Sequence, residues 1–242
     1  MRASDFEFRY RFWIILLIFF VAFCCTFPPE NAVQWLLSLM GMPGPVVGVS
    51  PVGPVAHAIF ALGAVLVAVA AWIRTWGTAY LNNSVVQDSV VRAERLVADG
   101  PYRYVRNPLY LGSLLMAAGI GLLASPIGWV VLMAGMTVFS LRLIGREEAF
   151  LRENQGADYQ AYLERVPRLR PSLRPRVPTG GVEPSWNQAW VGEIGMWVLF
   201  IGSAYFALTL NGRVFGIIVI AGLLGSRVTK RLTKPKVQPR RP

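Results

Sequence analysis

The densest group of side chains able to bind or transform a ligand lies where a turn-forming segment joins an apolar run. These side chains are Tyr102, Arg103, Arg106, Asn107 and Tyr110. Pro108 lies among them and suits the first turn of a helix, where its missing N–H group costs no hydrogen bond. The free N–H groups of such a helix start attract anions. The sequence therefore predicts an anion site here, suited to a carboxylate and assisted by arginine or tyrosine.

A second polar group follows the next apolar run and consists of Arg142, Arg146, Glu147 and Glu148. Ser125-Pro126 separates the two runs and predicts a tight turn, so residues 108–124 and 127–144 form an antiparallel hairpin. The hairpin brings both polar groups to one end, where a glutamate would accept an ammonium group. Together they indicate a zwitterionic ligand with an amino-acid moiety. Because consecutive helical residues lie about 100° apart, we expect one glutamate to face the pocket and the other to face solvent.

Several kinds of chemistry lack the residues that they need. The chain has one histidine, His57, within an apolar run, and its two cysteines, Cys24 and Cys25, are adjacent. No P-loop, GxGxxG or CxxC pattern occurs. We therefore expect no metal site, and we expect His57 to have a packed or interfacial role.

The composition is typical of a membrane protein. Of the 242 residues, 54% are hydrophobic and 15% are charged, against about 25% charged in a typical soluble domain. Several uncharged runs approach the roughly 20 residues that a spanning helix needs. We expect an all-α polytopic integral membrane bundle with five to six transmembrane helices in a single domain, residues 1–242. The helices are expected near residues 12–27, 54–73, 108–124, 127–144, 190–210 and 213–226.

The distribution of the net charge of +11 predicts the orientation. If the runs alternate across the membrane, 23 of the 24 Lys and Arg residues lie on one side and Arg213 alone lies on the other. The loop at 28–53 has no basic residue. By the positive-inside rule both termini are cytoplasmic. We expect a bacterial inner-membrane protein whose site faces the cytoplasm. The basic tail at 230–241 favours contact with anionic lipid over nucleic acid.

The segments around the two polar groups have simpler patterns. Residues 146–166 predict an amphipathic surface helix interrupted near Gly156, and 168–184 is a proline-rich linker. Residues 85–99 are expected to cover the site. Arg74 closes the second run as a snorkelling side chain or as part of the pocket. Glu193 either pairs with an arginine of the site or lies among headgroups.

Two motifs resemble known families. Gly100-Pro101-Tyr102 followed by Arg106-Asn107-Pro108-Leu109-Tyr110-Leu111-Gly112 resembles the signature of isoprenylcysteine carboxyl methyltransferases. The wider group to which these enzymes belong also includes phospholipid N-methyltransferases. Glu147-Glu148 with Leu151, Gly156, Tyr159, Tyr162 and Val166-Pro167 is similar to the second signature of that group. The resemblance covers about residues 96–171. It divides the chain into N-terminal helices at 1–95, this core, and a C-terminal hairpin with the basic tail at 172–242.

The resemblance implies an integral membrane enzyme that transfers a methyl group from S-adenosylmethionine to a lipophilic acceptor in the bilayer. The acceptor is a prenylcysteine-like carboxylate or a lipid amine. An arginine, Arg142 or Arg146, would hold a carboxylate, and Glu148 or Glu147 would take the proton of an amine. The residues expected to bind the cofactor are Gly100, Tyr102, Arg106, Asn107, Pro108, Tyr110, Leu111, Gly112, Glu147, Glu148 and Tyr159.

Asn107 departs from the resembling families, which usually have histidine at this position. Asn keeps a hydrogen-bond donor and an acceptor but carries no charge, so binding can survive the change and proton transfer by this residue cannot. Two alternatives follow. The chain is a non-catalytic membrane scaffold derived from the family, or it is a nicotinamide-dependent reductase of the sterol reductase type, whose members carry a related Arg-His-Pro-x-Tyr pattern.

Overall fold

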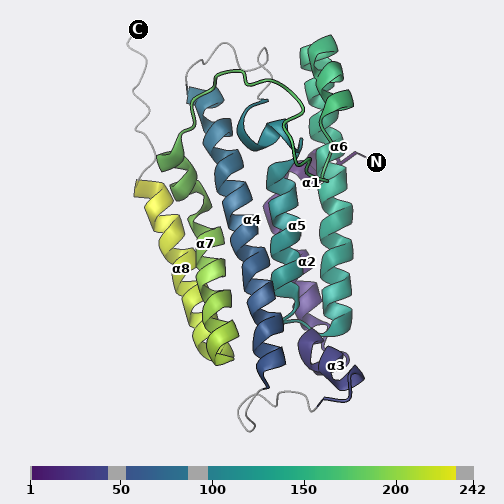
Figure 1. The fold of residues 1–242 in the computed structure, drawn as a ribbon, viewed down its shortest axis with the longest axis vertical. Helices are drawn as coiled ribbons and strands as arrows, with labels where there is room; N and C mark the ends of the chain where they lie inside the picture. The colour runs from purple at the N-terminus through teal and green to yellow at the C-terminus, as the bar shows by residue number, and fades with distance from the viewer. Residues whose placement is uncertain (1, 43–52, 87–97, 233–242) are drawn as a thin grey trace.

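The computed structural model of the chain describes residues 2–42, 53–86 and 98–232. Every regular element in these ranges is helical (Figure 1). The elements are α1 (Asp5–Arg9), α2 (Arg11–Cys24), α3 (Ala32–Leu39), α4 (Pro54–Val86), η1 (Gly100–Arg103), α5 (Pro108–Gly121), α6 (Pro126–Arg165), α7 (Trp186–Thr209) and α8 (Gly212–Leu232). The expected all-α class is confirmed.

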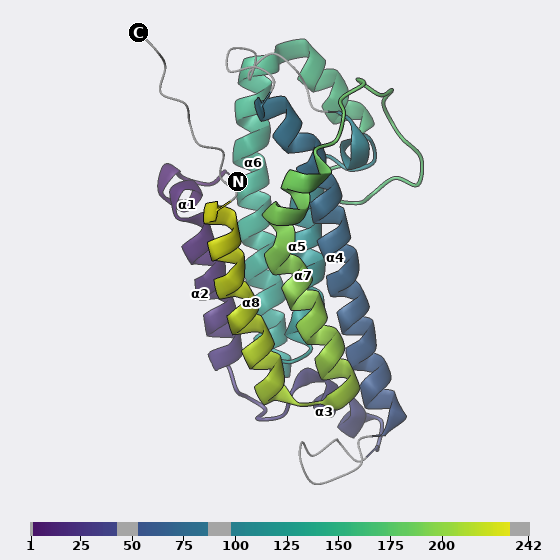
Figure 2. The same cartoon turned by 90° about the vertical axis from the view of Figure 1, so that its left-hand side faces the viewer.

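The longer helices run side by side and alternate in direction, with α4 packed between α5 and α7 (Figures 1 and 2). We call the end that holds α1 and η1 the α1 end, and the opposite end, where α3 lies, the α3 end. Helix α8 runs back towards the α1 end, so α1 and the last described turns of α8 lie at the same end of the bundle.

The six apolar runs expected from the sequence all form helices, but their lengths differ. Three helices are long and apolar enough to cross a membrane: Pro54–Leu81, Pro126–Arg165 and Trp186–Thr209. Three further apolar helices are shorter: Arg11–Cys24, Pro108–Gly121 and Gly212–Ser226. The structure is therefore that of an integral membrane protein with three full-length spans and three shorter apolar helices in its described part.

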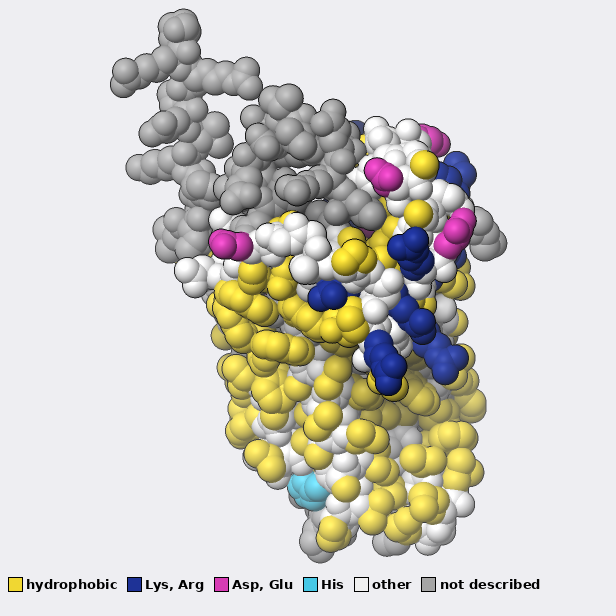
Figure 3. All heavy atoms as spheres, turned by 45° about the horizontal axis from the view of Figure 1, so that its top comes forward, with side chains coloured by type: hydrophobic (Ala, Val, Ile, Leu, Met, Phe, Trp, Pro, Cys, Tyr) yellow, Lys and Arg dark blue, Asp and Glu magenta, His cyan; other side chains and the backbone are white. Residues whose placement is uncertain are grey.

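The outer surface of the bundle is apolar along its length. Phe20, Leu62, Val130, Leu208 and Ile217, from five different helices, each expose more than half of their surface. Figure 3 shows this apolar surface below an end where charged side chains gather. In water so much exposed hydrocarbon would be costly, whereas lipid chains cover such a surface without cost. The charged end is the α1 end.

Helices α4 and α5 approach each other closely where two glycines face. A Cβ atom on Gly119 would lie 2.4 Å from the carbonyl oxygen of Gly63. Small residues of this kind allow membrane helices to pack backbone against backbone. Further towards the α1 end, a Cβ atom on Gly112 would lie 2.5 Å from Cγ of Arg74. The close contact therefore places Arg74 of α4 directly beside the first turns of α5.

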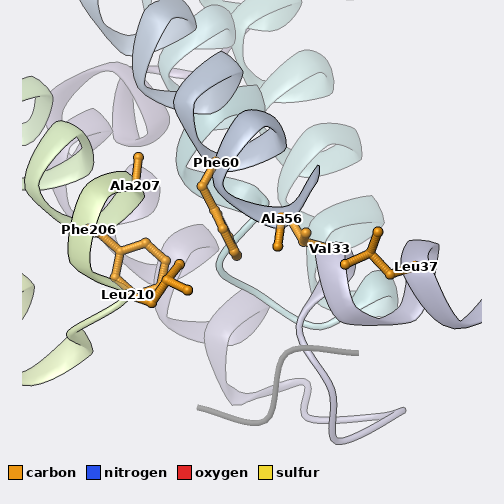
Figure 4. Packing of buried hydrophobic residues seen from close by; sticks show 7 residues of the cluster. All are labelled: Val33, Leu37, Ala56, Phe60, Phe206, Ala207 and Leu210. Carbon is orange, nitrogen blue, oxygen red and sulfur yellow. The ribbon is translucent and has the colours of Figure 1, made fainter. Parts of the chain in front are cut away.

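A buried apolar cluster closes the α3 end (Figure 4). Its side chains are Val33, Leu37, Ala56, Phe60, Phe206, Ala207 and Leu210, from α3, α4 and α7 with the residue after it. Next to the cluster, Nδ1 of His57 lies 2.6 Å from the carbonyl oxygen of Ala207. This contact fits the packed role expected for His57.

Local signals in the sequence set the ends and breaks of α6. The Ser125 side chain caps the helix by accepting a hydrogen bond from the Gly128 amide at 3.0 Å, which confirms the hairpin with α5. Gly156 has φ 54° and ψ −125°, so the interruption expected there is also confirmed. The expected cover at 85–99 lies mostly outside the described residues.

Candidate functional site

A cavity of about 580 Å³ opens at the α1 end among α2, α4, α5 and α6. Its wall contains eight of the residues expected from the sequence: Tyr102, Arg106, Asn107, Pro108, Tyr110, Glu147, Glu148 and Tyr159. The two polar groups therefore meet, as the hairpin predicts. Apolar side chains complete the wall, among them Phe12, Ile15, Leu81, Met136 and Leu143. The cavity thus joins a charged region to a hydrocarbon region.

Glu148 is the buried charge at the centre of this wall, with a side chain 5% exposed. Nη2 of Arg106 lies 3.2 Å from its Oε1, and Arg168 pairs with it through both Nε and Nη2. Nδ2 of Asn107 donates to the same Oε1 at 3.4 Å. A buried carboxylate persists as an ion only when it is paired and hydrogen-bonded in this way. Glu148 therefore ties α6 to the start of α5 and to the chain beyond α6.

Arg106 and Asn107 are held by the chain that follows α6. Nη1 of Arg106 donates to the carbonyl oxygen of Leu163 at 2.5 Å, and Nδ2 of Asn107 donates to that of Arg168 at 3.1 Å. The Asn107 side chain does not cap α5, so it leaves the first amide groups of that helix free of its own oxygen. Among the described side chains, Nε of Arg106 is buried without a hydrogen-bond partner, as is Oε1 of Gln155, which also lines the cavity.

Glu147 lies on the same wall, where the Tyr110 hydroxyl donates to its Oε1 at 2.8 Å. The expectation that one of the two glutamates faces solvent is wrong. Both line the cavity, and Glu148 is the more deeply buried. The reason is tertiary, because the chain beyond α6 folds back and brings Arg168 over the side of the helix that would otherwise be open.

The chain that folds back, residues 167–185, runs along η1 and is called the strap here. Three backbone hydrogen bonds of 2.9–3.0 Å join the two segments. The Arg106 amide donates to a carbonyl of the strap, and the amides of Ser172 and Arg176 donate to carbonyls at the end of η1 and just after it. At the far end of the strap, the Ser185 amide donates to Ala79 of α4 at 2.8 Å. The segment expected to be a linker because of its prolines is therefore ordered, and its hydrogen bonds hold the residues that precede α5 in place.

Asp99 holds the C-terminal half of the strap in place. Its carboxylate accepts from the Thr179 hydroxyl at 2.6 Å and from the amides of Gly180 and Val182 at 2.7 and 3.0 Å. Burial by itself would raise the pKa of Asp99, but these hydrogen bonds and the nearby Arg103 outweigh it and lower the pKa. Burial also raises the pKa of Tyr102 in η1, so this phenol stays neutral in the wall.

Arg142 and Arg146 lie elsewhere than the sequence suggested. Nε and Nη2 of Arg142 bond to Glu7 of α1 at 2.8 and 2.7 Å, and Nη2 of Arg146 lies 2.6 Å from Asp5. Neither lines the cavity. The hydrogen bond from Arg142 is the main cause that lowers the pKa of Glu7 to about 2. These two arginines anchor α1, and the arginine that α2 contributes to the wall is Arg11.

Gly100, Leu111 and Gly112 also lie outside the lining of the cavity. Gly100 has φ +56°, and a Cβ atom there would lie 2.4 Å from the Tyr80 ring, so a side chain is excluded on two grounds. Gly112 gives room to Arg74. The glycines of the first motif therefore shape the backbone around the cavity and do not line it.

Arg74 and Glu193 form a site element that the sequence left undecided. Nε and Nη2 of Arg74 bond to the two carboxylate oxygens of Glu193 at 2.8 and 3.0 Å. Nη1 of Arg74 donates to Ser113 at 2.9 Å and to the Leu109 carbonyl at 3.1 Å. Of the two readings for Glu193, the ion pair is confirmed. The signal in the sequence was one acid and one base, each at the edge of an apolar run, but nothing in the sequence showed that these two runs would become neighbours.

The described residues offer no set of ligands for a metal ion. Within the ranges that the structure describes, no group of three His, Cys, Asp or Glu side chains could hold an ion. The charged groups of the cavity wall are instead arranged as a mixture of guanidinium and carboxylate, which suits an organic ligand bearing both signs of charge.

Comparison with known proteins agrees with the resemblance drawn from the motifs. The phospholipid methyltransferase family matches residues 58–158, less than half of the chain but including α5 and most of α6. Two relatives, each called a probable protein-S-isoprenylcysteine O-methyltransferase, come from the indica and japonica subspecies of Oryza sativa. Each is 34% identical over 73 residues, which is 30% of this chain and 38% of the relative. No solved structure matches the chain.

Proposed function

We propose that the protein is an integral membrane methyltransferase that uses S-adenosylmethionine to methylate a lipophilic acceptor drawn from the bilayer. The observation that carries the proposal is the cavity in which both signature motifs meet, with Glu147 and Glu148 facing the start of α5. Family resemblance over residues 58–158 supports the reaction class. Charge asymmetry in the sequence supports a cytoplasmic site.

The wall of the cavity fits the proposed cofactor. A volume of about 580 Å³ is within the roughly 300–1,000 Å³ of small-molecule sites. The free amides of the first turn of α5 and Nε of Arg106 suit a carboxylate. Glu147 suits an ammonium or sulfonium charge, and Oε1 of Gln155 can accept a hydrogen bond. When bound, S-adenosylmethionine supplies a methyl group already activated by the sulfonium.

The remaining work of the protein is alignment and exclusion of water. Phe12, Ile15 and Met136 give the apolar part of the wall that would receive a hydrocarbon chain. A carboxylate acceptor needs no base, and Arg11 takes the holding role first considered for Arg142 and Arg146, because it lines the cavity. An amine acceptor must lose a proton, and the carboxylate of Glu147 in the cavity wall is placed to take it. The Tyr110 hydroxyl orients this carboxylate by donating a hydrogen bond to its Oε1.

The test is binding of S-adenosylmethionine to the purified protein in lipid, measured by calorimetry. We expect micromolar affinity for the wild type and loss of binding in Glu148→Ala and Arg106→Ala. Because these substitutions break a buried ion pair, which costs roughly 3–5 kcal/mol, Gln155→Ala is the cleaner variant. It removes an oxygen that bonds to no described protein group and should weaken binding while the thermal midpoint stays unchanged.

Glu153→Ala, an exposed acid on the same helix, is the matched control and should bind as the wild type does. No binding by a folded wild type would overturn the proposal, and binding of a nicotinamide cofactor in its place would establish the reductase alternative. Binding without transfer of labelled methyl groups to any component of a lipid extract would establish the non-catalytic scaffold.

A further inference from the structure

A second, smaller cavity lies beside α6 and is separate from the one described above. Its volume is about 200 Å³, and its charged lining consists of Arg2, Arg152, Arg168 and Glu148. The three guanidinium groups come from the N-terminal segment, from α6 and from the strap. Backbone contact fixes the first of these segments, because the Ala3 amide donates to the Arg142 carbonyl of α6 at 3.0 Å.

The charges around this cavity do not balance. Among the residues that the structure describes, Glu148 is the one acid in its lining, and that carboxylate already pairs with Arg106 and Arg168. Within the ranges that the structure describes, neither Arg2 nor Arg152 forms an ion pair. Two unpaired guanidinium groups therefore converge on a polar hollow, and an anion placed there would be attracted by both.

The surroundings of the hollow indicate the source of that anion. Arg2 in its lining lies three residues before α1 begins. Phe6 in α1, and Phe12 and Trp13 at the start of α2, expose 66%, 55% and 62% of their surface. Exposed aromatic side chains next to arginines are typical of the level of lipid headgroups. Figure 3 shows basic side chains gathered at the border between the apolar surface and the charged end. Phospholipids present their phosphates at this level.

We propose that Arg2, Arg152 and Arg168 bind the phosphate of an anionic phospholipid headgroup. Arginine suits this role because its planar fork can bond to two phosphate oxygens at once. The bound lipid would occupy a different cavity from the methyl acceptor, and Glu148 lines both cavities. The proposal depends on membrane residence and not on the methyl-transfer reaction. It does connect the two sites, because Arg168 would be shared between the lipid phosphate and Glu148.

Native mass spectrometry of the full-length protein, titrated with phosphatidylglycerol, tests the proposal. We expect one tight site in the wild type, and weaker affinity by about fivefold for Arg2→Gln or Arg152→Gln and about 25-fold for both, from roughly fivefold per arginine near a membrane surface. Arg165→Gln, an exposed arginine near the end of α6, is the matched control. Arg2 and Arg152 do not line the larger cavity, so the affinity of their variants for S-adenosylmethionine, measured in parallel, should not change.

Three results would overturn the lipid site. They are unchanged phosphatidylglycerol affinity in the double variant, an equal loss in Arg165→Gln, and equal binding of phosphatidylcholine. Inorganic phosphate serves as a further competitor, and displacement of the lipid by millimolar phosphate would assign the hollow to a soluble anion instead. Thermal midpoints without lipid, equal in wild type and variants, show that a lost site does not reflect misfolding.

Discussion

Asn107 stands where the resembling families usually carry histidine, and its contacts explain what an amide does there. Its Nδ2 donates to Glu148 and to the Arg168 carbonyl. An uncharged amide has two N–H groups and can serve both acceptors at any pH, whereas a neutral imidazole has one. The substitution therefore keeps the wall of the cavity together and gives up a group that could titrate.

Asn107→Asp should reveal this role. The variant loses both donors and places a second carboxylate beside Glu148, so we expect the affinity for S-adenosylmethionine to fall about tenfold, from the roughly 1–3 kcal/mol cost of unsatisfied buried groups. Calorimetry provides the measurement. Asn154→Asp makes the same chemical change on the exposed face of α6 and should bind normally. Equal affinity in the two variants would remove Asn107 from the site.

At the scale of elements, the sequence predicts local features better than pairings. Ser125 and Gly156 mark the turn before α6 and the break within it, since both signals act on the backbone around them. The pairing of Arg142 with Glu7 could not be foreseen, because it joins residues 135 apart through a five-residue helix too short to show a periodicity. The strap escaped prediction for the same reason, since the hydrogen bonds that fix it in place go to distant residues such as Tyr104, Asp99 and Ala79.

The contact of α4 with α5 should be sensitive to a single methyl group. In Gly119→Ala the new Cβ meets the Gly63 carbonyl at 2.4 Å, and backbone cannot yield as a side chain does. We expect a loss of about 1–3 kcal/mol in stability, seen as a lower thermal midpoint in a fixed detergent. Gly216→Ala in α8 has open space around the new atom and should show no decrease. A Gly119→Ala variant with an unchanged thermal midpoint would mean that α4 and α5 can move apart without a loss of stability.

At the scale of the molecule, the segment that matches the methyltransferase family is enclosed by helices outside the match. Residues 58–158 supply most of the cavity wall, while α2 adds Arg11 and α7 holds Arg74 through Glu193. The predicted class and the meeting of the two motifs could be read from the sequence. The contributions of α2 and α7 could not, because they depend on which helices become neighbours.

The predicted orientation has a direct test in cells. With Cys24 and Cys25 replaced by alanine, single cysteines are placed at exposed sites at the two ends, Ser38→Cys at the α3 end and Asp158→Cys at the α1 end. We expect a membrane-impermeant maleimide to label Ser38→Cys on intact cells and Asp158→Cys only after lysis, because the arginines gather at the α1 end. The reverse pattern would place the cavity outside the cytoplasm.

The ion pair of Arg74 with Glu193 also sets an order for biogenesis. Glu193 follows Arg74 by 119 residues, so the ribosome delivers α4 to the membrane well before its counter-charge exists. During that interval the guanidinium can be solvated by headgroups and then by Ser113 and Leu109 of α5, and it meets the carboxylate of Glu193 only when α7 arrives. A chain released early would carry both motifs and still lack a finished cavity. Assembly of the site is therefore a late, C-terminal event.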